Sequence, residues 1–517
     1  MSHFSSLDWA IVAVYLIGTM FAGIAVRKFV GKVEHFLVAG REMGLSLGIA
    51  SLSATEFGIV TCMYMAQTGY DKGFSGAVVG ILGAAAMLFI GLTGFCVKPL
   101  RDAGVITIPE LLERRFGYGI RRLSGVVIIL GGLLNMGVFL RMGGNFLVHV
   151  FGISGQAAAR AAEAAASPSW MNALMAWAGT HYLELTMTGL LIAVATYTIM
   201  GGMLSVLVTD FLQFVVMSIG LLLVTVIILR DVGWGKLTAT VMEHYGEGGF
   251  NPIAHPKMGW QYIGFNLLLQ TAAMLTWQTK IQRLLAAKDS ATSRRIYSAS
   301  CFFTVCACLL PGLWGIAALA TLPSGVVPAS DTTVAMPMLL ASIVPVGLMG
   351  ILIASMLAAE MSTDSSYMLT WASVIYNDIL SRKRKAKWTE RKRLGANRIL
   401  VGAIGLFLMF YGLWYEIKGD VWTYLGLTGT VYLSSMSALL IACCYWKRSN
   451  NWGALGAIIC GAVFPVGFLV LQKVPATEAF AERLGPYIPG IAAYVAAGLA
   501  MVIGSYLKIA VKGEEAA

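Results

Sequence analysis

Charged side chains are scarce in this sequence. Only 12% of its 517 residues are Asp, Glu, Lys or Arg, whereas a soluble domain carries roughly a quarter. Apolar stretches of the roughly 20 residues that a helix needs to cross a hydrocarbon layer recur along the whole chain. Because backbone groups in lipid must bond within their own segment, each stretch becomes a helix. The composition therefore excludes a soluble fold and predicts an all-α integral membrane protein.

Patterns typical of enzymes, metal clusters and barrels are also missing. The six histidines are scattered, and the eight cysteines follow neither disulfide nor zinc spacing. Apolar stretches such as 126–138 lack the alternating polarity of barrel strands. No polar segment is long enough for a nucleotide-binding domain. We therefore expect neither an enzyme nor a β-barrel.

The apolar stretches predict about thirteen transmembrane helices. Their expected ranges are 7–26, 44–69, 74–97, 123–150, 183–200, 203–229, 259–281, 296–321, 344–380, 396–417, 421–446, 453–472 and 487–507. With the N-terminus outside, 28 of the 37 Lys and Arg residues fall in cytoplasmic segments. This bias follows the positive-inside rule and predicts a cytoplasmic C-terminus.

The basic run 382–385 and the net charge of +11 raise the alternative of a nucleic-acid partner. The run directly follows a predicted membrane helix, where basic residues hold topology and contact anionic headgroups. Membrane lipid, and not nucleic acid, is therefore the expected partner.

Five ionisable residues lie inside predicted membrane helices, where each is a functional candidate because its burial is costly. They are Glu56, Arg141, Asp210, Glu360 and Asp364. Asp210 is either a structural ion-pair partner or part of a cation site. Glu360 and Asp364 are like charges four residues apart, which favours protonation of one of them, and their role stays open.

Small and polar residues interrupt the second predicted helix at 51–58, which includes Glu56 and Gly58. A break there would free backbone carbonyls at membrane depth, a feature that is tolerated where they line a cavity or hold an ion. The alternative is a continuous helix that uses small residues for close packing.

A stripe of small and hydroxyl residues follows the ninth predicted helix at spacings of three and four. Its members are Ser355, Ala359, Ser362, Thr363, Ser366, Thr370 and Ser373. Their oxygens suit a small hard cation. The alternative is a packing stripe whose hydroxyls bond back to their own helix.

Four motifs together resemble those of the sodium/solute symporter family, over nearly the whole chain. They are Phe36-Leu37-Val38-Ala39-Gly40-Arg41, the segment 107–117, Gly201-Gly202 with Thr209, Asp210 and Gln213, and Gln278 with 282–289. Ala359, Met361, Ser362 and Thr363 add to the match.

This resemblance implies a LeuT-like core of two inverted five-helix repeats, with one helix before and two after. The expected divisions are 1–43, a first repeat at 44–229, an exterior loop at 230–258, a second repeat at 259–446 and two C-terminal helices at 447–517. Substrate and ion would meet near the midplane.

The resemblance also implies binding residues. A conserved sodium site would use the carbonyls of Ala54, Phe57 and Ala359 with the hydroxyls of Ser362 and Thr363. A second sodium would use Asp210, Ser362, Ser365 and Ser366. The solute would lie among Thr55, Glu56, Gly58, Thr61, Gln270 and Arg141. An arginine that binds a carboxylate would favour an organic acid, a sugar acid or a zwitterion.

The resulting prediction is a sodium-coupled symporter that imports a small polar solute with one or two sodium ions. We expect it to work as a monomer in the plasma membrane, as in a bacterial inner membrane. The alternatives are a proton-coupled transporter of the same fold, and, with less support, a sensor or a channel.

Overall fold

The computed structural model describes residues 5–151, 170–380, 388–414 and 420–512, and these residues form helices and connecting turns. The basic run 382–385 lies outside them. The helices are α1 (Ser6–Ala25), η1 (Val26–Phe29), α2 (Val33–Val38), η2 (Ala39–Arg41), α3 (Leu45–Glu56), α4 (Ile59–Lys72), η3 (Gly73–Ala77), α5 (Val78–Thr93), α6 (Val97–Asp102), α7 (Ile108–Phe151), α9 (Trp170–Thr180), α10 (Tyr182–Asp231), α11 (Trp234–Tyr245), η4 (Gly246–Gly249), α12 (Gly259–Thr276), α13 (Gln278–Ala286), α14 (Ser290–Thr321), η5 (Thr332–Val334), α15 (Ala335–Ile343), α16 (Leu348–Val374), η6 (Ile375–Ile379), α18 (Glu390–Trp414), α19 (Val421–Tyr445), α20 (Asn451–Leu471), α21 (Pro475–Leu484) and α22 (Tyr487–Lys512).

The all-helical membrane architecture predicted from the sequence is confirmed. Within the described residues, nine helical segments are long and apolar enough to cross a membrane. Two predicted spans, those that correspond to α12 and α16, fall outside this number, and the segments Ile59–Thr93 and Tyr182–Asp231 each contain parts of two predicted spans. The number thirteen therefore stays a prediction.

Long helices in the structure contain more than one predicted span. The 50 residues of α10 would reach about 75 Å if straight, far more than a hydrocarbon layer of about 30 Å. Gly202 interrupts α10 with φ 55° and ψ −145°, a conformation that glycine adopts readily. This interruption lies between the predicted spans 183–200 and 203–229. Gly117 likewise separates the first turns of α7 from its membrane-spanning part.

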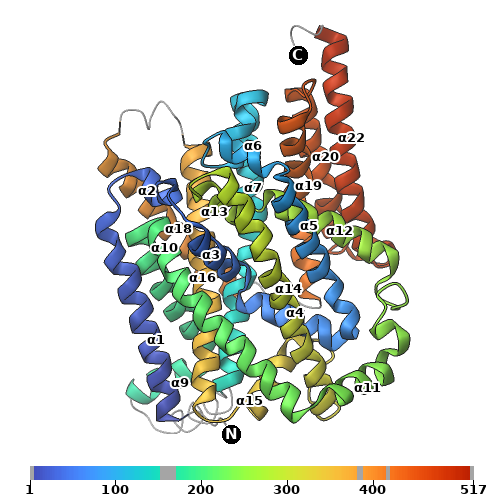
Figure 1. The fold of residues 1–517 in the computed structure, drawn as a ribbon. Coiled ribbons are helices and arrows are strands. Elements are labelled where there is room, and N and C mark those ends of the chain that lie inside the picture. Colours follow the sequence, from blue (N-terminus) through green and yellow to red (C-terminus); the bar gives the residue numbers. More distant parts are fainter. Residues whose placement is uncertain (1–4, 152–169, 381–387, 415–419, 513–517) are drawn as a thin grey trace.

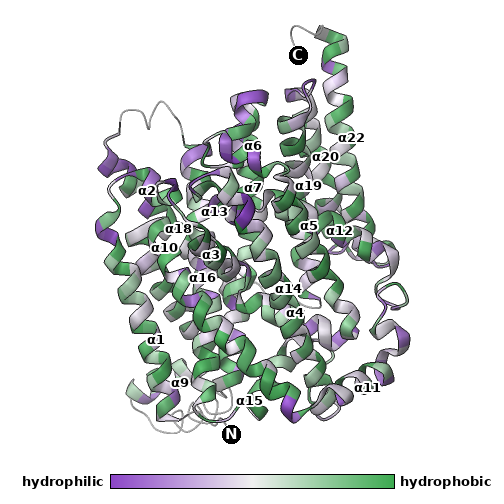
Figure 2. Ribbon diagram, viewed as in Figure 1, coloured by the Kyte–Doolittle hydropathy of each residue, from purple (hydrophilic) through white to green (hydrophobic). Residues whose placement is uncertain are grey.

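The helices form one bundle with α1 at one edge and α20 and α22 at the other (Figure 1). The start of α1 and the end of α22 lie at opposite ends of the bundle (Figure 1). Hydrophobic residues cover the long outer helices, while hydrophilic residues gather near the two ends (Figure 2). The short helix α3 and the polar helix α16 lie in the interior, where all residues of α16 from Leu352 to Val374 are buried.

Two glycines bring the backbones of α4 and α14 into direct contact. A Cβ at Gly315 would lie 1.8 Å from the Ala66 carbonyl oxygen, and one at Gly69 would lie 2.0 Å from the Gly312 carbonyl oxygen. Neither neighbour can move without shifting a helix backbone. The second half of the broken helix, α4, is thus fixed to α14.

We predict that Gly315→Ala strongly destabilises the protein, by about 1 to 3 kcal/mol or more, because the added methyl group overlaps the α4 backbone. Gly395→Ala in α18 is the matched control, since no atom lies within 4 Å of its new Cβ. That control should be neutral or stabilising by about 1 kcal/mol. The melting temperatures of both purified variants in detergent test this expectation, and equal values would contradict it.

Candidate functional site

The second predicted span is broken, as the sequence indicated. Helix α3 ends at Glu56 and α4 begins at Ile59, with Phe57 (φ −108°, ψ 76°) and Gly58 (φ −88°, ψ 167°) in non-helical conformations between them. Gly58 permits a close approach of α16, because a Cβ there would lie 2.7 Å from the Thr363 hydroxyl oxygen. The carbonyls at the end of α3 therefore face a neighbouring helix instead of a continued chain.

Hydroxyl groups of α16 donate hydrogen bonds to the carbonyl oxygens that this break frees. The Ser362 hydroxyl lies 2.8 Å from the Ala54 carbonyl oxygen and 3.0 Å from that of Ala359. The Thr363 hydroxyl lies 3.0 Å from the Ala359 carbonyl oxygen and 3.3 Å from that of Thr55. We call this set of oxygen atoms the α3–α16 oxygen cluster.

The cluster brings together four of the five groups that were predicted to bind the conserved sodium: the carbonyls of Ala54 and Ala359 and the hydroxyls of Ser362 and Thr363. The fifth, Phe57, is the first residue of the break, and its N–H donates to the Ala54 carbonyl oxygen at 3.3 Å. All five residues are buried. Their assignment to sodium stays a prediction.

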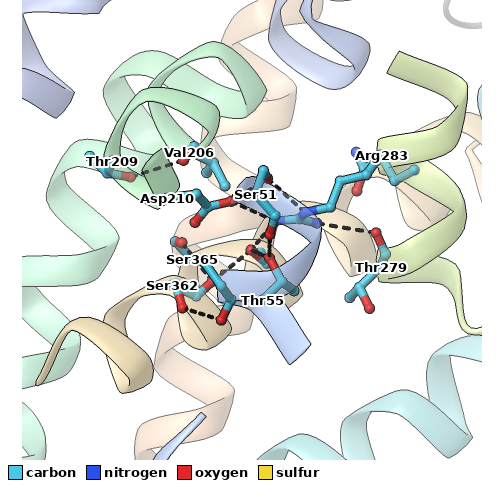
Figure 3. Close-up of polar contacts among 12 residues, drawn as sticks. Ser51, Thr55, Val206, Thr209, Asp210, Thr279, Arg283, Ser362 and Ser365 are labelled. Atoms are coloured by element: carbon cyan, nitrogen blue, oxygen red, sulfur yellow. Dashed lines mark hydrogen bonds and ion pairs between the residues drawn. The ribbon is translucent and has the colours of Figure 1, made fainter. Parts of the chain in front are cut away.

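A fully buried ion pair lies next to this cluster (Figure 3). The Arg283 guanidinium donates to the Asp210 carboxylate at 3.0 Å and to the Ser51 hydroxyl at 2.9 Å. It also contacts the Ser366 hydroxyl, and the Ser51 hydroxyl donates to Asp210 at 2.5 Å. Asp210 and Arg283 are both 0% exposed. The structure thus places a guanidinium beside the carboxylate that was predicted to hold a second sodium.

That prediction also included Ser362 of the oxygen cluster and two further residues of α16, Ser365 and Ser366, near this ion pair. The Ser365 hydroxyl bonds back to the Ser362 carbonyl at 3.1 Å, within its own helix. The Ser366 hydroxyl lies between Arg283 and the Thr55 hydroxyl, which is 3.2 Å away. A second sodium here would have to share Asp210 with Arg283.

Arg283 belongs to a second broken helix that the sequence analysis did not foresee. Helices α12 and α13 are separated at Trp277 (φ −63°, ψ 110°), within the predicted span 259–281. Every residue of α13 is buried. Lys280 and Arg283, which count among the 28 basic residues of the predicted cytoplasmic segments, are thus buried against other helices of the chain.

A cavity of about 140 Å³ opens between the two breaks. Five of the six predicted solute-binding residues line it: Thr55, Glu56, Gly58, Thr61 and Gln270. Thr363 of the oxygen cluster lines it as well. Its aromatic walls come from Tyr64, Phe139, Trp277, Tyr367 and Trp422. The volume is below the roughly 300 Å³ of pockets for drug-sized molecules, so a small solute fits it best.

The sixth predicted residue, Arg141, is not among the described residues that line this cavity. The reason is helical geometry: Asn135 and Phe139 of α7 line it and lie four residues apart on one face. Arg141 is about 200° around the helix from Phe139. The role of Arg141 at the solute stays a prediction.

The cation of the cavity is Lys280. Its ammonium nitrogen lies 2.6 Å from a Glu56 carboxylate oxygen, and both residues line the cavity. The other Glu56 oxygen, Oε1, is buried without a hydrogen-bond partner. The cavity therefore presents a cation and an unsatisfied acceptor side by side.

Comparison with known proteins agrees with this architecture. The model of the sodium:solute symporter family matches residues 36–166 and 173–461. The chain belongs to this family. As a member of the sodium:solute symporter family it is a multi-pass membrane transporter and not an enzyme.

Curated relatives in the family transport different solutes. The chain is 26% identical to sodium/glucose cotransporter 4 of Danio rerio, with 92% of this chain and 73% of the relative covered. It is 25% identical to sodium/myo-inositol cotransporter 2 of Mus musculus, covering 90% and 70% of the two chains. It is 24% identical to the high-affinity proline transporter PutP of Bacillus subtilis, covering 91% and 92%.

Solved structures share the fold. A Na⁺-coupled sialic acid symporter in a substrate-bound outward-open state superposes with a TM-score of 0.77 at 17% identity, with 98% of each chain covered. MhsT in complex with L-phenylalanine gives a TM-score of 0.52 at 14% identity, covering 90% of this chain and 98% of MhsT. The LeuT-like fold inferred for the sodium:solute symporter family is thus confirmed for this member.

We predict that Arg283→Met destabilises the protein by about 3 to 5 kcal/mol, because it leaves the Asp210 carboxylate buried without a counter-charge. Asp210→Asn in the same chain should restore most of this loss. Thermal unfolding of the single and double variants measures the coupling. The exposed pair of Arg230 and Asp231 supplies the control, since Arg230→Gln should change stability by less than about 1 kcal/mol. Additive effects of Arg283→Met and Asp210→Asn would show that the two residues do not interact.

Proposed function

We propose that this protein is a sodium-coupled symporter that imports a small polar organic solute by alternating access. The observation that carries the proposal is the shared boundary between the α3–α16 oxygen cluster and the cavity. Thr55 and Thr363 supply oxygens to the cluster and also line the cavity. An ion in the cluster and a solute in the cavity would therefore contact the same residues.

The chemistry of the cluster suits sodium. Its oxygens are carbonyls and hydroxyls without formal charge, which are hard ligands for a small hard cation. Two of its carbonyls, those of Ala54 and Thr55, lie at the C-terminal end of α3, where the helix dipole is negative. Sodium would replace the direct hydrogen bonds between these helices by bonds from each oxygen to the ion. Related sodium-coupled proteins support the same coupling ion.

Coupling follows from this geometry. Sodium would hold the end of α3 against α16 and so fix Thr55, Gly58 and Thr363 in the wall of the cavity. A solute that binds the ordered wall more tightly would stabilise sodium binding by the same factor, typically about 1 to 3 kcal/mol. The inside-negative potential adds about 2.3 kcal/mol per charge at 100 mV. Uphill import of the solute is the expected result.

We further propose a stoichiometry of one sodium ion. Asp210 is the carboxylate beside the cluster, and Arg283 compensates its charge at 3.0 Å. A second sodium at Asp210, Ser362, Ser365 and Ser366 would require this guanidinium to move away. A reversal-potential measurement in liposomes distinguishes the two cases, because two sodium ions would double the dependence on the sodium gradient.

The solute proposal follows from Glu56 and Lys280. The unpartnered Glu56 oxygen needs a donor, such as a hydroxyl or an ammonium group, and Lys280 can bind an acceptor, such as a carboxylate. A sugar acid, a hydroxylated organic acid or a zwitterion offers both. The aromatic walls suit the apolar face of such a molecule. Lys280 thus takes the role that the sequence analysis gave to Arg141.

The remaining features of the proposal concern the whole chain. We propose that 44–229 and 259–446 are the two inverted repeats, because each begins with a broken helix, at 57–58 and at 277. We propose a monomer as the functional unit, because segments from both of these repeats line one cavity. The charge bias favours a plasma membrane location with the N-terminus outside.

We predict that sodium raises the melting temperature of the purified protein relative to choline at equal ionic strength, because a ligand of the native state stabilises it. Ser362→Ala with Thr363→Ala should abolish this increase. Ser437→Ala is the matched control, since its buried hydroxyl bonds only within α19, to the Ser434 carbonyl.

Full sodium stabilisation in the Ser362/Thr363 double variant would refute the proposed sodium site. Uptake of the identified solute in liposomes extends the test. Equal uptake when potassium replaces sodium would reject coupling, and uptake that does not saturate would indicate a channel.

We predict that Glu56→Gln and Lys280→Met each weaken binding of the solute by about 10-fold to 100-fold, because each removes one charge-assisted contact. A thermal-shift screen of small acids, sugars and amino acids with sodium present identifies the solute. Repeating it with the two variants tests the contacts. Arg141→Gln should leave the solute affinity unchanged, and a loss equal to that of Lys280→Met would contradict the placement of Lys280 at the solute.

A further inference from the structure

The fold brings together two cysteines that lie far apart in the sequence. Cys96 lies in the turn between α5 and α6, and Cys444 lies in the last turn of α19. Both are free thiols, and their side chains share a hydrogen bond. Because sulfur atoms in such contact need only a small movement to reach bonding distance, the pair has the proximity that a disulfide requires.

Two further contacts hold the Cys96 turn against the end of α19. The Cys96 backbone N–H donates to the Tyr445 hydroxyl at 2.9 Å. The Phe95 ring stacks on the Tyr445 ring, with 5.1 Å between the ring centroids and 7° between the planes. Tyr445 directly follows Cys444 in the chain. The backbone and the rings thus place this turn beside Cys444 independently of the two thiols.

The turn holds Cys96 in an unusual backbone conformation. Its φ of 57° and ψ of −33° lie in a region that residues other than glycine rarely adopt. The Val97 N–H donates to the Phe95 carbonyl oxygen at 2.7 Å, which closes a three-residue turn around Cys96. Such strained residues persist where their surroundings fix them, and they are frequent at functional positions.

The two thiols differ in their access to small oxidants. Cys96 is 1% exposed, whereas Cys444 is partly exposed. Arg114 and Arg115 of α7 interact electrostatically with Cys443, the residue before Cys444. Partial exposure and positively charged surroundings favour the reactive thiolate form of a cysteine. Cys444 is therefore the thiol that an oxidant would reach first.

Neighbouring cysteines are placed differently. The Cys443 thiol donates to the Leu111 carbonyl oxygen of α7 at 3.9 Å. Cys62 and Cys308 interact electrostatically with each other, but both are buried. Within the described residues, no group of three or more His, Cys, Asp or Glu could hold a metal ion. Oxidation of Cys96 and Cys444 is therefore the chemistry that this contact favours.

Cys96 belongs to the same body as the fixed pair of α4 and α14. A Cβ at Gly91 of α5 would lie 2.6 Å from the Ser298 backbone nitrogen of α14. The Arg294 guanidinium of α14 donates to the Gly91 carbonyl oxygen at 3.2 Å. The end of α5 that leads to Cys96 is thus held by α14.

A bond between Cys96 and Cys444 would tie this body to α19. Both sides of the bond contribute to the cavity wall, with Tyr64 from α4, Thr304 from α14 and Trp422 from α19. Helix α6, which follows Cys96, lies toward the end of the bundle at which α22 ends (Figure 1). The bond would therefore restrain separation of these helices at that end.

We propose that Cys96 and Cys444 form a reversible disulfide on exposure to a peroxide, and that this disulfide stops the opening of the cavity at this end of the bundle. The Cys444 thiolate attacks one oxygen of hydrogen peroxide, the O–O bond breaks, and the hydroxide that leaves takes up the thiol proton to form water. The Cys96 sulfur then attacks the resulting sulfenic acid and displaces a second water. The two cysteines are oxidised to one disulfide, and the peroxide is reduced to two waters.

The effect on transport rests on the proposed function. The charge bias predicts that this end of the bundle is cytoplasmic, where disulfides are transient and redox-sensing. The reduced protein is then the transporting form. Import stops in the oxidised form because α19 and the body of α4, α5 and α14 no longer separate. A thiol reductant reverses the block by exchange with the disulfide.

Mass spectrometry of the full-length protein in lipid nanodiscs tests the disulfide. After treatment with hydrogen peroxide and alkylation of free thiols, digestion without reduction should give a peptide that contains Cys96 linked to one that contains Cys444. Dithiothreitol before alkylation should remove the link. Cys96→Ser and Cys444→Ser should each abolish it, and Cys443→Ser should retain it. Cys460→Ser is the matched control, because it removes a partly exposed thiol of α20.

The melting temperature gives a second measurement that needs no solute. A cross-link between distant parts of the chain constrains the unfolded state. Peroxide should therefore raise the melting temperature of the wild type and of Cys460→Ser relative to Cys444→Ser, and dithiothreitol should reverse the difference. Cys444→Ser serves alone if Cys96→Ser does not fold. The inference is overturned if no peptide links the two cysteines, or if the link persists in Cys444→Ser.

Uptake in liposomes separates this inference from the proposed function. With the solute that the thermal-shift screen identifies, peroxide should abolish uptake by the wild type and by Cys460→Ser, but not by Cys444→Ser. Dithiothreitol should restore it. A linked peptide together with unchanged uptake rejects the block of opening and keeps the symporter. A linked peptide in a protein that sodium does not stabilise supports the disulfide and rejects the sodium coupling.

Discussion

The structure depends on one constraint: a backbone carbonyl that is freed inside a membrane must find another donor or an ion. Helix α3 ends at Glu56, and the carbonyl oxygens of its last residues accept hydrogen bonds from the hydroxyls of Ser362, Thr363 and Thr61. The contacts of Ser362 and Thr363 join two helices that are about 300 residues apart in the sequence. The break, the absent side chain at Gly58 and the cavity are three aspects of this arrangement.

Charge is arranged around the same break. The second broken helix contributes two cations from α13, Lys280 toward Glu56 and Arg283 toward Asp210. A short helix that carries both cations thus contacts two different helices of the first repeat, α3 at its last residue and α10 in its interior. Each ion pair therefore crosses between the proposed repeats, so that movement of one repeat against the other must rearrange buried charge. This organisation suits the proposed alternating access, in which the cavity opens to one side of the membrane while it is closed to the other.

The sequence was sufficient for the membrane class, the family, the first break and five residues that line the cavity. The first break was visible because small and polar residues surround Glu56, an ionisable residue that is costly at mid-span. The second break was missed because Thr276, Trp277 and Gln278 contain neither glycine nor proline. Its interruption arises from tertiary packing, which no local pattern reports.

Charge counting did not foresee the burial of two cations. Lys280 and Arg283 follow an apolar segment, so the positive-inside rule counts them as loop residues, although partners elsewhere in the chain allow their burial. Arg141 was assigned to the solute by resemblance, and it lies about 200° around α7 from Phe139, which lines the cavity. The hydroxyl stripe of α16 was clear in the sequence, and the family resemblance implied that it faces the second predicted helix, which agrees with the contacts of Ser362 and Thr363 with α3.

The glycine contact between α4 and α14 has a consequence for how the protein changes shape. Helix backbones in van der Waals contact cannot slide past each other without steric overlap, so α4 and α14 travel as a single rigid unit. The second segment of the broken helix, α4, then moves together with the whole of α14. We expect the cavity to open when α4 and α14 tilt together about the break at Phe57–Gly58. The solute would then leave between this pair of helices and the rest of the bundle.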